Sequence, residues 1–229
     1  MLISFDGLDS SGKETQVKTL VERFIREGRT VRRFQTPDYT TPSGQELKAR
    51  LQNKIGQWEA TSWRDKAGFF ASNRLEHKSE VDKALSQGEI VIYDRYIPSS
   101  LTFMAVEAGL AAREEVYAFI RDLEYTQNNM PPEALSVFLD VPPRVAIELL
   151  NTRKQVQYEA DEYTDQLDIQ EKLYEEYQHL CGTDPDHYIK INCVIKGQLR
   201  SIQAIHEDIY AHLKKSLENS YPTEYNKLL

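Results

Sequence analysis

The stretch Gly7-Leu8-Asp9-Ser10-Ser11-Gly12-Lys13-Glu14-Thr15 follows the apolar run Leu2–Phe5 and opens an amphipathic pattern at Lys13. It has the form GxxxxGK at a strand-to-helix junction, which is the context that a phosphate-binding loop requires. Glycines let backbone N–H groups curl around phosphate oxygens, the helix N-terminus adds a positive dipole end, and the lysine supplies a point charge. The stretch therefore predicts an ATP-binding loop made by Gly7, Ser10, Ser11, Gly12, Lys13, Glu14 and Thr15.

One position departs from the usual form of this loop. The residue after the lysine is commonly Ser or Thr, whose hydroxyl binds Mg²⁺, and here it is Glu14. A carboxylate at this place can hold the metal directly. Alternatively, Glu14 is a first-turn acid that the helix dipole stabilises, while Thr15 takes part in the site. Both interpretations of Glu14 remain open from the residues alone.

The pattern on either side of the loop predicts the fold class. Val17, Leu20, Val21 and Phe24 recur at helical spacing up to Gly28, so a helix is expected from about Lys13 to Glu27. Short β-rich runs alternate with such helical patterns, which favours a parallel sheet covered on both faces. The expected strands are Leu2–Phe5, Thr30–Phe34, Ile90–Tyr93, Ser136–Leu139 and Tyr188–Ile191. The other expected helices are Gly44–Leu51, Thr61–Leu85, Glu114–Tyr125, Arg144–Asn151, Asp165–Leu180 and Gln198–Leu217.

The length and net charge of the chain limit the number of domains and the kinds of partner that we expect. The chain has 229 residues with 28 Lys and Arg against 36 Asp and Glu, a net charge of −8, and 40% hydrophobic residues. We expect one domain over residues 1–215 and a C-terminal tail over 216–229, because this length suits a single core. A net-acidic chain is not typical of proteins that coat nucleic acid or an anionic membrane, so neither is expected as a partner.

Cysteines and apolar runs bear on the compartment. Cys181 and Cys193 are too few for a disulfide framework, and no apolar stretch reaches the roughly 20 residues of a membrane span. We therefore expect neither a leader nor an anchor, and a cytoplasmic location.

Three blocks in order carry a family resemblance. They are residues 5–16 around the loop, Phe69-Phe70-Ala71-Ser72-Asn73-Arg74, and Gly88 to Ser100 with Asp94-Arg95-Tyr96. Together they resemble the thymidylate kinase family, over about residues 1–215. The resemblance implies a three-layer P-loop kinase fold with a five-stranded parallel sheet. It also implies Mg²⁺-dependent phosphoryl transfer from ATP to dTMP, giving dTDP for dTTP biosynthesis.

The resemblance assigns roles on the acceptor side. Phe70 matches the aromatic residue that stacks on the thymine ring, and Arg74, four residues later on the same helical face, matches the arginine that binds the base. Arg95 matches the residue that contacts the monophosphate and bridges to the donor phosphates, and Asp94 matches a residue that supports the metal shell. Phe70 as a core residue, and an Asp94–Arg95 ion pair at a strand end, are the structural alternatives.

Further positions match less completely. Asp9 matches the acid that accepts a hydrogen bond from the sugar 3′-hydroxyl, and Tyr39 lies in a loop that approaches the acceptor phosphate. Asp38 stands where that loop often has an arginine. Ser100 stands where the family often has Asn, Thr or Gln near the base, and Phe103 matches an aromatic residue that crowds the sugar 2′ position. Plain core packing is the alternative for Phe103.

Phosphoryl transfer needs cations at the moving group. One branch of the family has an arginine in the loop directly after the acid, where this chain has Ser10. The other branch takes it from a lid, here expected at about residues 151–165, and we expect Arg153 to be that catalytic arginine beside Lys13 and Arg95. The resemblance also implies a homodimer.

Two other functions stay open. A deoxynucleoside kinase would need a Glu-Arg-Ser signature at the strand end, where this chain has Asp94-Arg95-Tyr96. A nucleotide-binding regulator that has lost catalysis is favoured only by Glu14, Asp38 and Ser100. Turnover with dTMP, compared with turnover of thymidine and with dTMP binding, separates the three.

Overall fold

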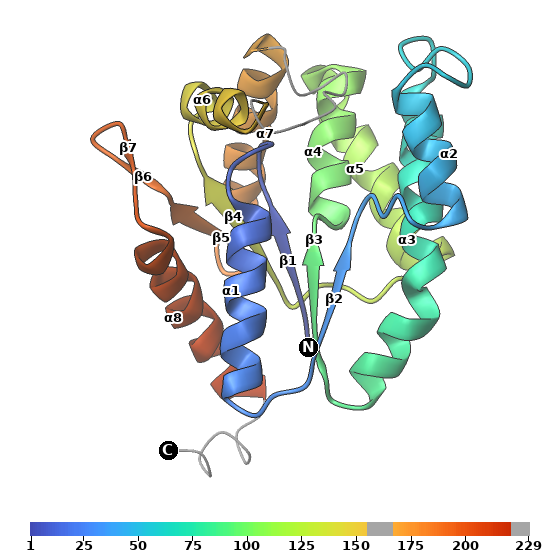
Figure 1. The fold of residues 1–229 in the computed structure, drawn as a ribbon. Helices are drawn as coiled ribbons and strands as arrows, with labels where there is room; N and C mark the ends of the chain where they lie inside the picture. The colour runs from blue at the N-terminus through green and yellow to red at the C-terminus, as the bar shows by residue number, and fades with distance from the viewer. Residues whose placement is uncertain (155–166, 221–229) are drawn as a thin grey trace.

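A five-stranded parallel sheet forms the centre of the molecule. The computed structural model describes residues 1–154 and 167–220. The strands run in the order β2-β3-β1-β4-β5, so the first strand of the chain lies in the middle (Figure 1). Their bounds are β1 Leu2–Asp6, β2 Val31–Gln35, β3 Ile90–Asp94, β4 Leu135–Asp140 and β5 Tyr188–Asn192. The predicted fold class is confirmed, and each predicted strand is present.

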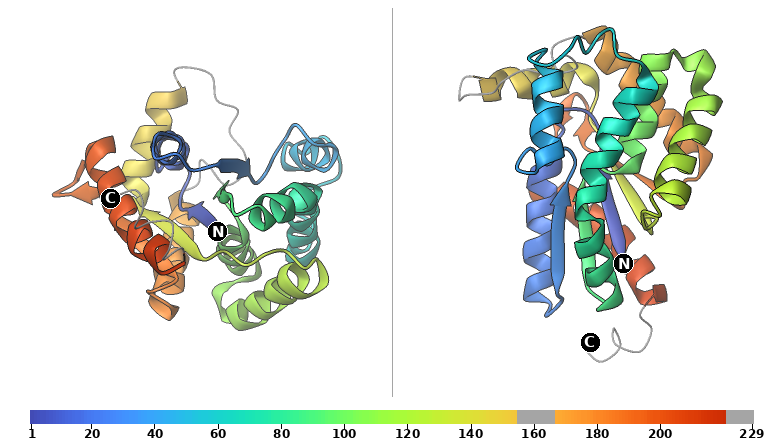
Figure 2. Two further views of the ribbon diagram at one scale, coloured as in Figure 1. Left: turned by 90° about the horizontal axis from the view of Figure 1, so that it is seen from below. Right: turned by 90° about the vertical axis from the view of Figure 1, so that its right-hand side faces the viewer.

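Helices cover both faces of this sheet. α1 (Lys13–Arg26) and α8 (Ile202–Ser220) pack on one face, while α3 (Trp63–Ser86), α4 (Ile97–Ala108) and α7 (Leu167–Thr183) lie on the other (Figures 1 and 2). The remaining helices are α2 Pro42–Leu51, α5 Arg113–Arg121 with its π-helical extension Asp122–Gln127, and α6 Pro143–Lys154.

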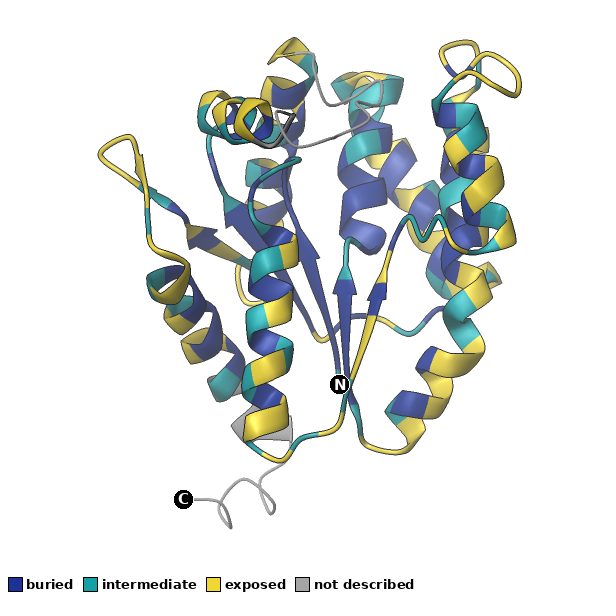
Figure 3. Cartoon of the chain, in the orientation of Figure 1, coloured by how far each residue is buried: buried dark blue, intermediate teal, exposed yellow. Residues whose placement is uncertain are grey.

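Burial explains why the apolar runs become strands. Every residue of β1 is buried, as expected for a central strand with a helix layer on each side (Figure 3). β2 is an edge strand and is mostly exposed, with Phe34 as its one buried residue. All strands end at the same side of the sheet, so the loops after β1, β2, β3 and β4 meet there. In such sheets this edge binds ligands.

α4 was not predicted from the sequence. This helix buries most of its residues, so it shows no polar face and hence no amphipathic period. Pro98 sits in its first turn, where the absence of an N–H costs nothing. A helix that is buried on all sides reads as an irregular apolar run.

The start predicted for the last helix was wrong. Gln198–Leu199 pairs with Val194–Ile195 in a short antiparallel hairpin, and α8 begins at Ile202. Lys196 and Gly197 both have positive φ, which is the conformation of a two-residue hairpin turn. α8 then continues to Ser220, through part of the segment predicted as a tail.

No helix in the described ranges is long and apolar enough to cross a membrane. Cys181 and Cys193 are both buried free thiols, and burial raises the pKa of each to about 12. Thiols of this kind are inert core residues at neutral pH.

Candidate active site

The loop between β1 and α1 has the backbone of a phosphate-binding loop. Gly7 has φ 139° and Gly12 has φ 91°, conformations that only glycine adopts without strain. A Cβ on Gly7 would lie 3.2 Å from the Leu139 carbonyl oxygen, so the loop also packs tightly against the end of β4. In the described part of the chain, the buried hydroxyl of Ser11 has no hydrogen-bond partner. An unpaired polar atom inside a ring of backbone amides fits a loop that closes on a phosphate.

Lys13 is folded back into this loop. Its Nζ donates to the carbonyl oxygens of Gly7 at 3.1 Å and Leu8 at 2.7 Å, and the side chain is buried. Burial, followed by the nearby positive charge of Arg95, lowers the pKa of Lys13 to about 8. Among the described residues the ammonium forms no ion pair with a carboxylate and donates only to carbonyl oxygens, so it can take an anionic ligand.

A cavity that is partly open to solvent lies next to the loop. It is lined by residues of the β2–α2 loop, α3, the end of β3 and α4, together with Asp9 of the phosphate loop. Every residue predicted to bind the acceptor lines it: Asp9, Tyr39, Phe70, Arg74, Arg95, Ser100 and Phe103. Residues of the lining that the sequence analysis did not single out are Thr36, Pro37, Leu51, Tyr96, Ser99 and Met104.

Arg95 joins the cavity to the phosphate loop. Its backbone has φ 64°, which turns the chain sharply between β3 and α4. The guanidinium forms an ion pair with Asp9 and donates to the Gly7 carbonyl oxygen at 2.9 Å. Burial alone favours the neutral form, but the Asp9 carboxylate outweighs it and raises the pKa of Arg95. The pair predicted as a structural alternative, Asp94 with Arg95, is replaced here by Asp9 with Arg95.

Arg74, the residue predicted to bind the base, also lines the cavity. Its side chain is 1% exposed, and Nη2 donates to the Ser100 hydroxyl at 2.8 Å. Nε donates to Glu124 Oε1 at 2.9 Å. Glu124 carries no signal in the sequence, because it comes from the π-helical turn 50 residues further along the chain.

Aromatic rings form the apolar wall of the cavity. The ring of Phe70 meets Trp58 edge-on, with 6.2 Å between centroids. Phe70 is half-buried rather than buried, so its ring has a face available in the cavity. Phe103 also lines the cavity, and the Arg95 guanidinium lies 5.5 Å from the centroid of its ring. Neither aromatic side chain is fully buried, whereas the core-packing alternative predicts full burial.

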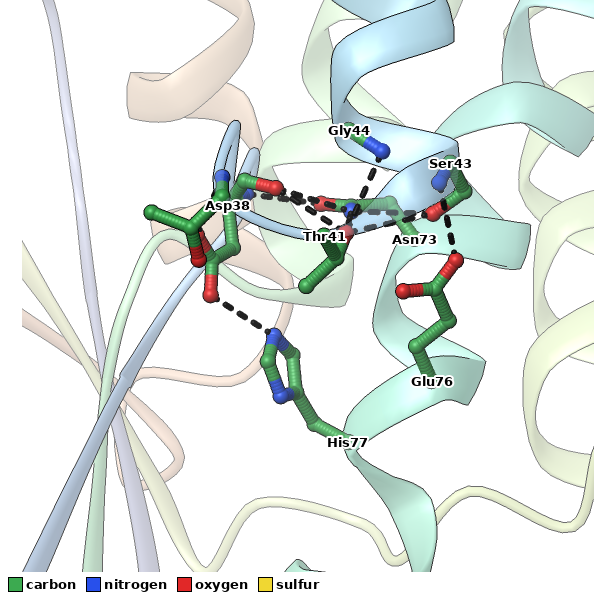
Figure 4. Close-up of polar contacts among 8 residues, drawn as sticks. Asp38, Thr41, Ser43, Gly44, Asn73, Glu76 and His77 are labelled. Carbon is green, nitrogen blue, oxygen red and sulfur yellow. Dashed lines mark hydrogen bonds and ion pairs between the residues drawn. The ribbon is translucent and has the colours of Figure 1, made fainter.

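The loop after β2 is tied to α3, as Figure 4 shows. Asn73 accepts a hydrogen bond from the Asp38 amide at 2.8 Å and donates to Thr41 Oγ1 at 2.9 Å. The Asp38 carboxylate turns to Thr40 and to His77, whose Nε2 lies 3.2 Å from Oδ2. Burial would raise the pKa of Asp38, but the Thr40 hydrogen bonds and His77 hold it below its usual value. Asp38 is therefore an anchor of the loop, while its neighbours Pro37 and Tyr39 line the cavity.

The oxygen ligands available for Mg²⁺ are few. Asp94 lies at the end of β3, 3.8 Å from an Arg33 nitrogen, and its charge acts on Lys13. Glu14 is exposed in the first turn of α1. No cluster of three acidic, histidine or cysteine side chains that could hold a metal occurs among the described residues. This donor set fits a Mg²⁺ ion held by one or two carboxylates and by nucleotide phosphates, which is the usual arrangement in kinases.

The predicted lid is only partly within the described residues. Arg153 belongs to the last turn of α6, and its side chain and residues 155–166 lie outside what the structure describes. α6 itself lies beyond the N-terminal end of α1, at the edge of the sheet where the phosphate loop is found (Figures 1 and 2).

Asp6 is a further residue that sequence reasoning missed. Its carboxylate is buried at the end of β1 and accepts hydrogen bonds from Ser4 at 2.7 Å and Ser136 at 3.1 Å. The Ser99 hydroxyl donates to the other oxygen and also contacts Tyr177. Asp6 thereby joins β1, β4 and α4 beneath the cavity. An acid directly before a GxxxxGK loop was the available signal.

Comparison with known proteins adds an independent finding. The thymidylate kinase family pattern matches residues 5–209. A protein named thymidylate kinase from Staphylococcus epidermidis is 27% identical, with 94% of this chain and 98% of that protein aligned. One of the same name from Plasmodium falciparum is 29% identical over 99% and 94% of the two chains. A probable thymidylate kinase from Pyrococcus abyssi is also 29% identical, over 94% and 96%.

Proposed function

The chain belongs to the thymidylate kinase family and is a phosphotransferase, and we propose that it transfers the γ-phosphoryl group of ATP to dTMP, giving dTDP. The observation that carries this proposal is that Phe70, Arg74 and Arg95 line one cavity, in which Arg95 is bonded to Asp9 and Gly7 of the phosphate loop. An aromatic ring suits a base, and the two arginines suit a carbonyl oxygen and a phosphate. The loop with Lys13 would hold the ATP phosphates.

Each group of site residues has a separate proposed role in phosphoryl transfer. This reaction needs aligned phosphates and neutralised charge rather than covalent help from the protein. The loop amides and Lys13 would orient the donor, and Arg95 would hold the acceptor phosphate next to it. Bound Mg²⁺ would neutralise phosphate charge, and Asp94 and Glu14 are the carboxylates placed to support it. Arg153 is proposed to supply the remaining positive charge.

The sugar is proposed to lie between Asp9 and Phe103. A carboxylate accepts the 3′-hydroxyl, and the aromatic ring leaves a 2′-hydroxyl without a partner, which disfavours ribonucleotides. We also propose a cytoplasmic homodimer, on the family resemblance. A mass near 26.5 kDa in light scattering would contradict the dimer.

The deciding experiment is an ADP-release assay on the full chain with Mg²⁺ and ATP. The acceptors are dTMP, dUMP, UMP, dCMP, AMP, GMP and thymidine. Turnover that is fastest with dTMP is expected. Turnover of thymidine in place of dTMP would favour a deoxynucleoside kinase. No turnover, together with a thermal shift on adding dTMP, would favour a regulator that has lost catalysis.

A further inference from the structure

The buried pair of Arg74 and Glu124 differs from an ordinary ion pair in how its bonds are distributed. Both side chains are 1% exposed. Glu124 Oε1 accepts from Nε at 2.9 Å and also from Nη2 of the same guanidinium. Ser100 Oγ accepts from Nη2 as well, at 2.8 Å. Two of the three guanidinium nitrogens are thus held from one side.

The third nitrogen has no such restraint. Among the described residues no hydrogen bond engages Nη1 of Arg74, although the residue lines the acceptor cavity. A guanidinium is planar and rigid, so fixing Nε and Nη2 also fixes the direction of the Nη1 hydrogens. Those hydrogens are left for a ligand.

The chemistry of Nη1 defines what that ligand group is. A guanidinium only donates hydrogen bonds and stays charged at all relevant pH values. It therefore favours a keto oxygen, as on thymine or uracil, over the amino group that cytosine carries at the same place. This selectivity depends on the guanidinium plane being held, and the holding group is Glu124.

The local backbone brings Glu124 to this place. It is the buried residue of the π-helical turn Asp122–Gln127, and Met130 donates its amide to the Glu124 carbonyl oxygen at 2.9 Å. π-helical turns are rare and are often found at functional sites. Within the described residues Glu124 Oε2 has no hydrogen-bond partner, so the carboxylate is buried for its bonds to Arg74 alone. A buried ion pair adds little net stability, because removing its charges from water costs about as much as their attraction gains.

We propose that Glu124 is a positioning residue that sets base selectivity by fixing the Arg74 guanidinium plane. The proposal rests on the proposed function, because it assumes that a pyrimidine base occupies the cavity. The readout is the ratio of kcat/KM for dTMP to kcat/KM for dCMP. This ratio does not depend on the fraction of folded enzyme, so a merely destabilising change leaves it unmoved.

The variants are Glu124→Gln and Glu124→Asp, with Glu176→Gln as the matched control. Glu176 is also buried and paired with an arginine, Arg113, at 2.6 Å, but it does not line the cavity. Glu124→Gln is expected to raise KM for dTMP about tenfold or more and to lower the dTMP preference by a similar factor, with a smaller change in kcat. Glu124→Asp keeps the charge but places the carboxylate further from the guanidinium, so a smaller loss of dTMP preference is expected. Glu176→Gln is expected to lower Tm and leave the preference as in wild type.

A double-mutant cycle tests whether Glu124 acts through Arg74. In an Arg74→Ala background, Glu124→Gln is expected to change KM for dTMP by less than about twofold, because no guanidinium remains to position. A wild-type preference in both Glu124 variants, or a full tenfold effect of Glu124→Gln without Arg74, would overturn the proposal. If wild-type enzyme fails to phosphorylate dTMP, it is the proposed function that fails, and this is seen before any variant is made.

Discussion

At the scale of single residues, the ionisation of Lys13 is the feature most open to measurement. Its ammonium is buried and forms no ion pair within the part of the chain that the structure describes, and burial lowers its pKa to about 8. The protonated form is the one proposed to bind the ATP phosphates, and it is lost as the pH rises through 8. We expect kcat/KM for ATP to fall above that pH by about tenfold per unit, since this parameter reports the free enzyme. We expect kcat to fall less, because bound phosphates favour the ammonium.

The comparison for this pH dependence is Lys13→Arg. A guanidinium stays charged across the whole range, so the variant is expected to show lower activity but a flat profile of kcat/KM for ATP between about pH 7 and 9.5. A wild-type profile that is also flat up to about pH 9.5 would show that Lys13 is not the titrating group.

Residues that share a local pattern were predictable, and residues that act across the fold were not. Phe70 and Arg74 lie four positions apart, and the spacing alone places them on one helical face. Glu124 was not predicted, because its partner Arg74 lies 50 residues away in the sequence. Asp6 stands directly before the loop, but two of its partners, Ser99 and Ser136, lie 93 and 130 residues away. Asp38 was singled out only because it stands where the family often has an arginine. In the structure its carboxylate bonds Thr40 and contacts His77.

At the scale of elements, the contact between α2 and the loop after β2 depends on one glycine. A Cβ on Gly44 would lie 1.7 Å from the Asp38 carbonyl oxygen, so a side chain here forces the backbone to move. We expect Gly44→Ala to lower the free energy of unfolding by about 1–3 kcal/mol and to raise KM for dTMP. The second effect follows because Pro37 and Tyr39 of the displaced loop line the cavity.

Gly68→Ala is the matched control for Gly44→Ala. Gly68 lies inside α3, and a Cβ there would meet no atom within 4 Å. Replacing an unconstrained helical glycine with alanine is expected to stabilise the protein by about 0.5–1 kcal/mol, without changing KM. Urea unfolding and dTMP kinetics on both variants measure these effects. Equal stability of the Gly44 and Gly68 variants would contradict the steric argument.

Helices and strands were predictable from the sequence when one face of the element is buried and the other is exposed. α1 buries Val17, Leu20 and Phe24 on one side, and its bounds were predicted to within one residue. α4 is buried almost throughout, and it was missed. Gln198–Leu199 was predicted as the start of the last helix but forms a hairpin strand, because a strand of two residues leaves little periodicity to detect.

At the scale of the whole molecule, charge is distributed unevenly. The chain carries a net charge of −8, yet Lys13, Arg74 and Arg95 gather at the carboxyl edge of the sheet. Two of these cations already have carboxylate partners, Glu124 and Asp9. For the proposed reaction, we therefore expect the moving phosphoryl group to need positive charge from a residue that does not line this cavity. The family resemblance and the position of α6 at the same edge point to Arg153.

Arg153→Ala measures that contribution. A cation that acts on the transition state lowers kcat and kcat/KM together when it is removed. We expect kcat to fall about 100- to 1,000-fold, with KM for dTMP changed less than about threefold. Arg26→Ala is the control, since it removes the same charge from the last turn of α1, at the opposite end of the sheet, and wild-type kinetics are expected. Undiminished turnover in Arg153→Ala would place the missing charge on another residue.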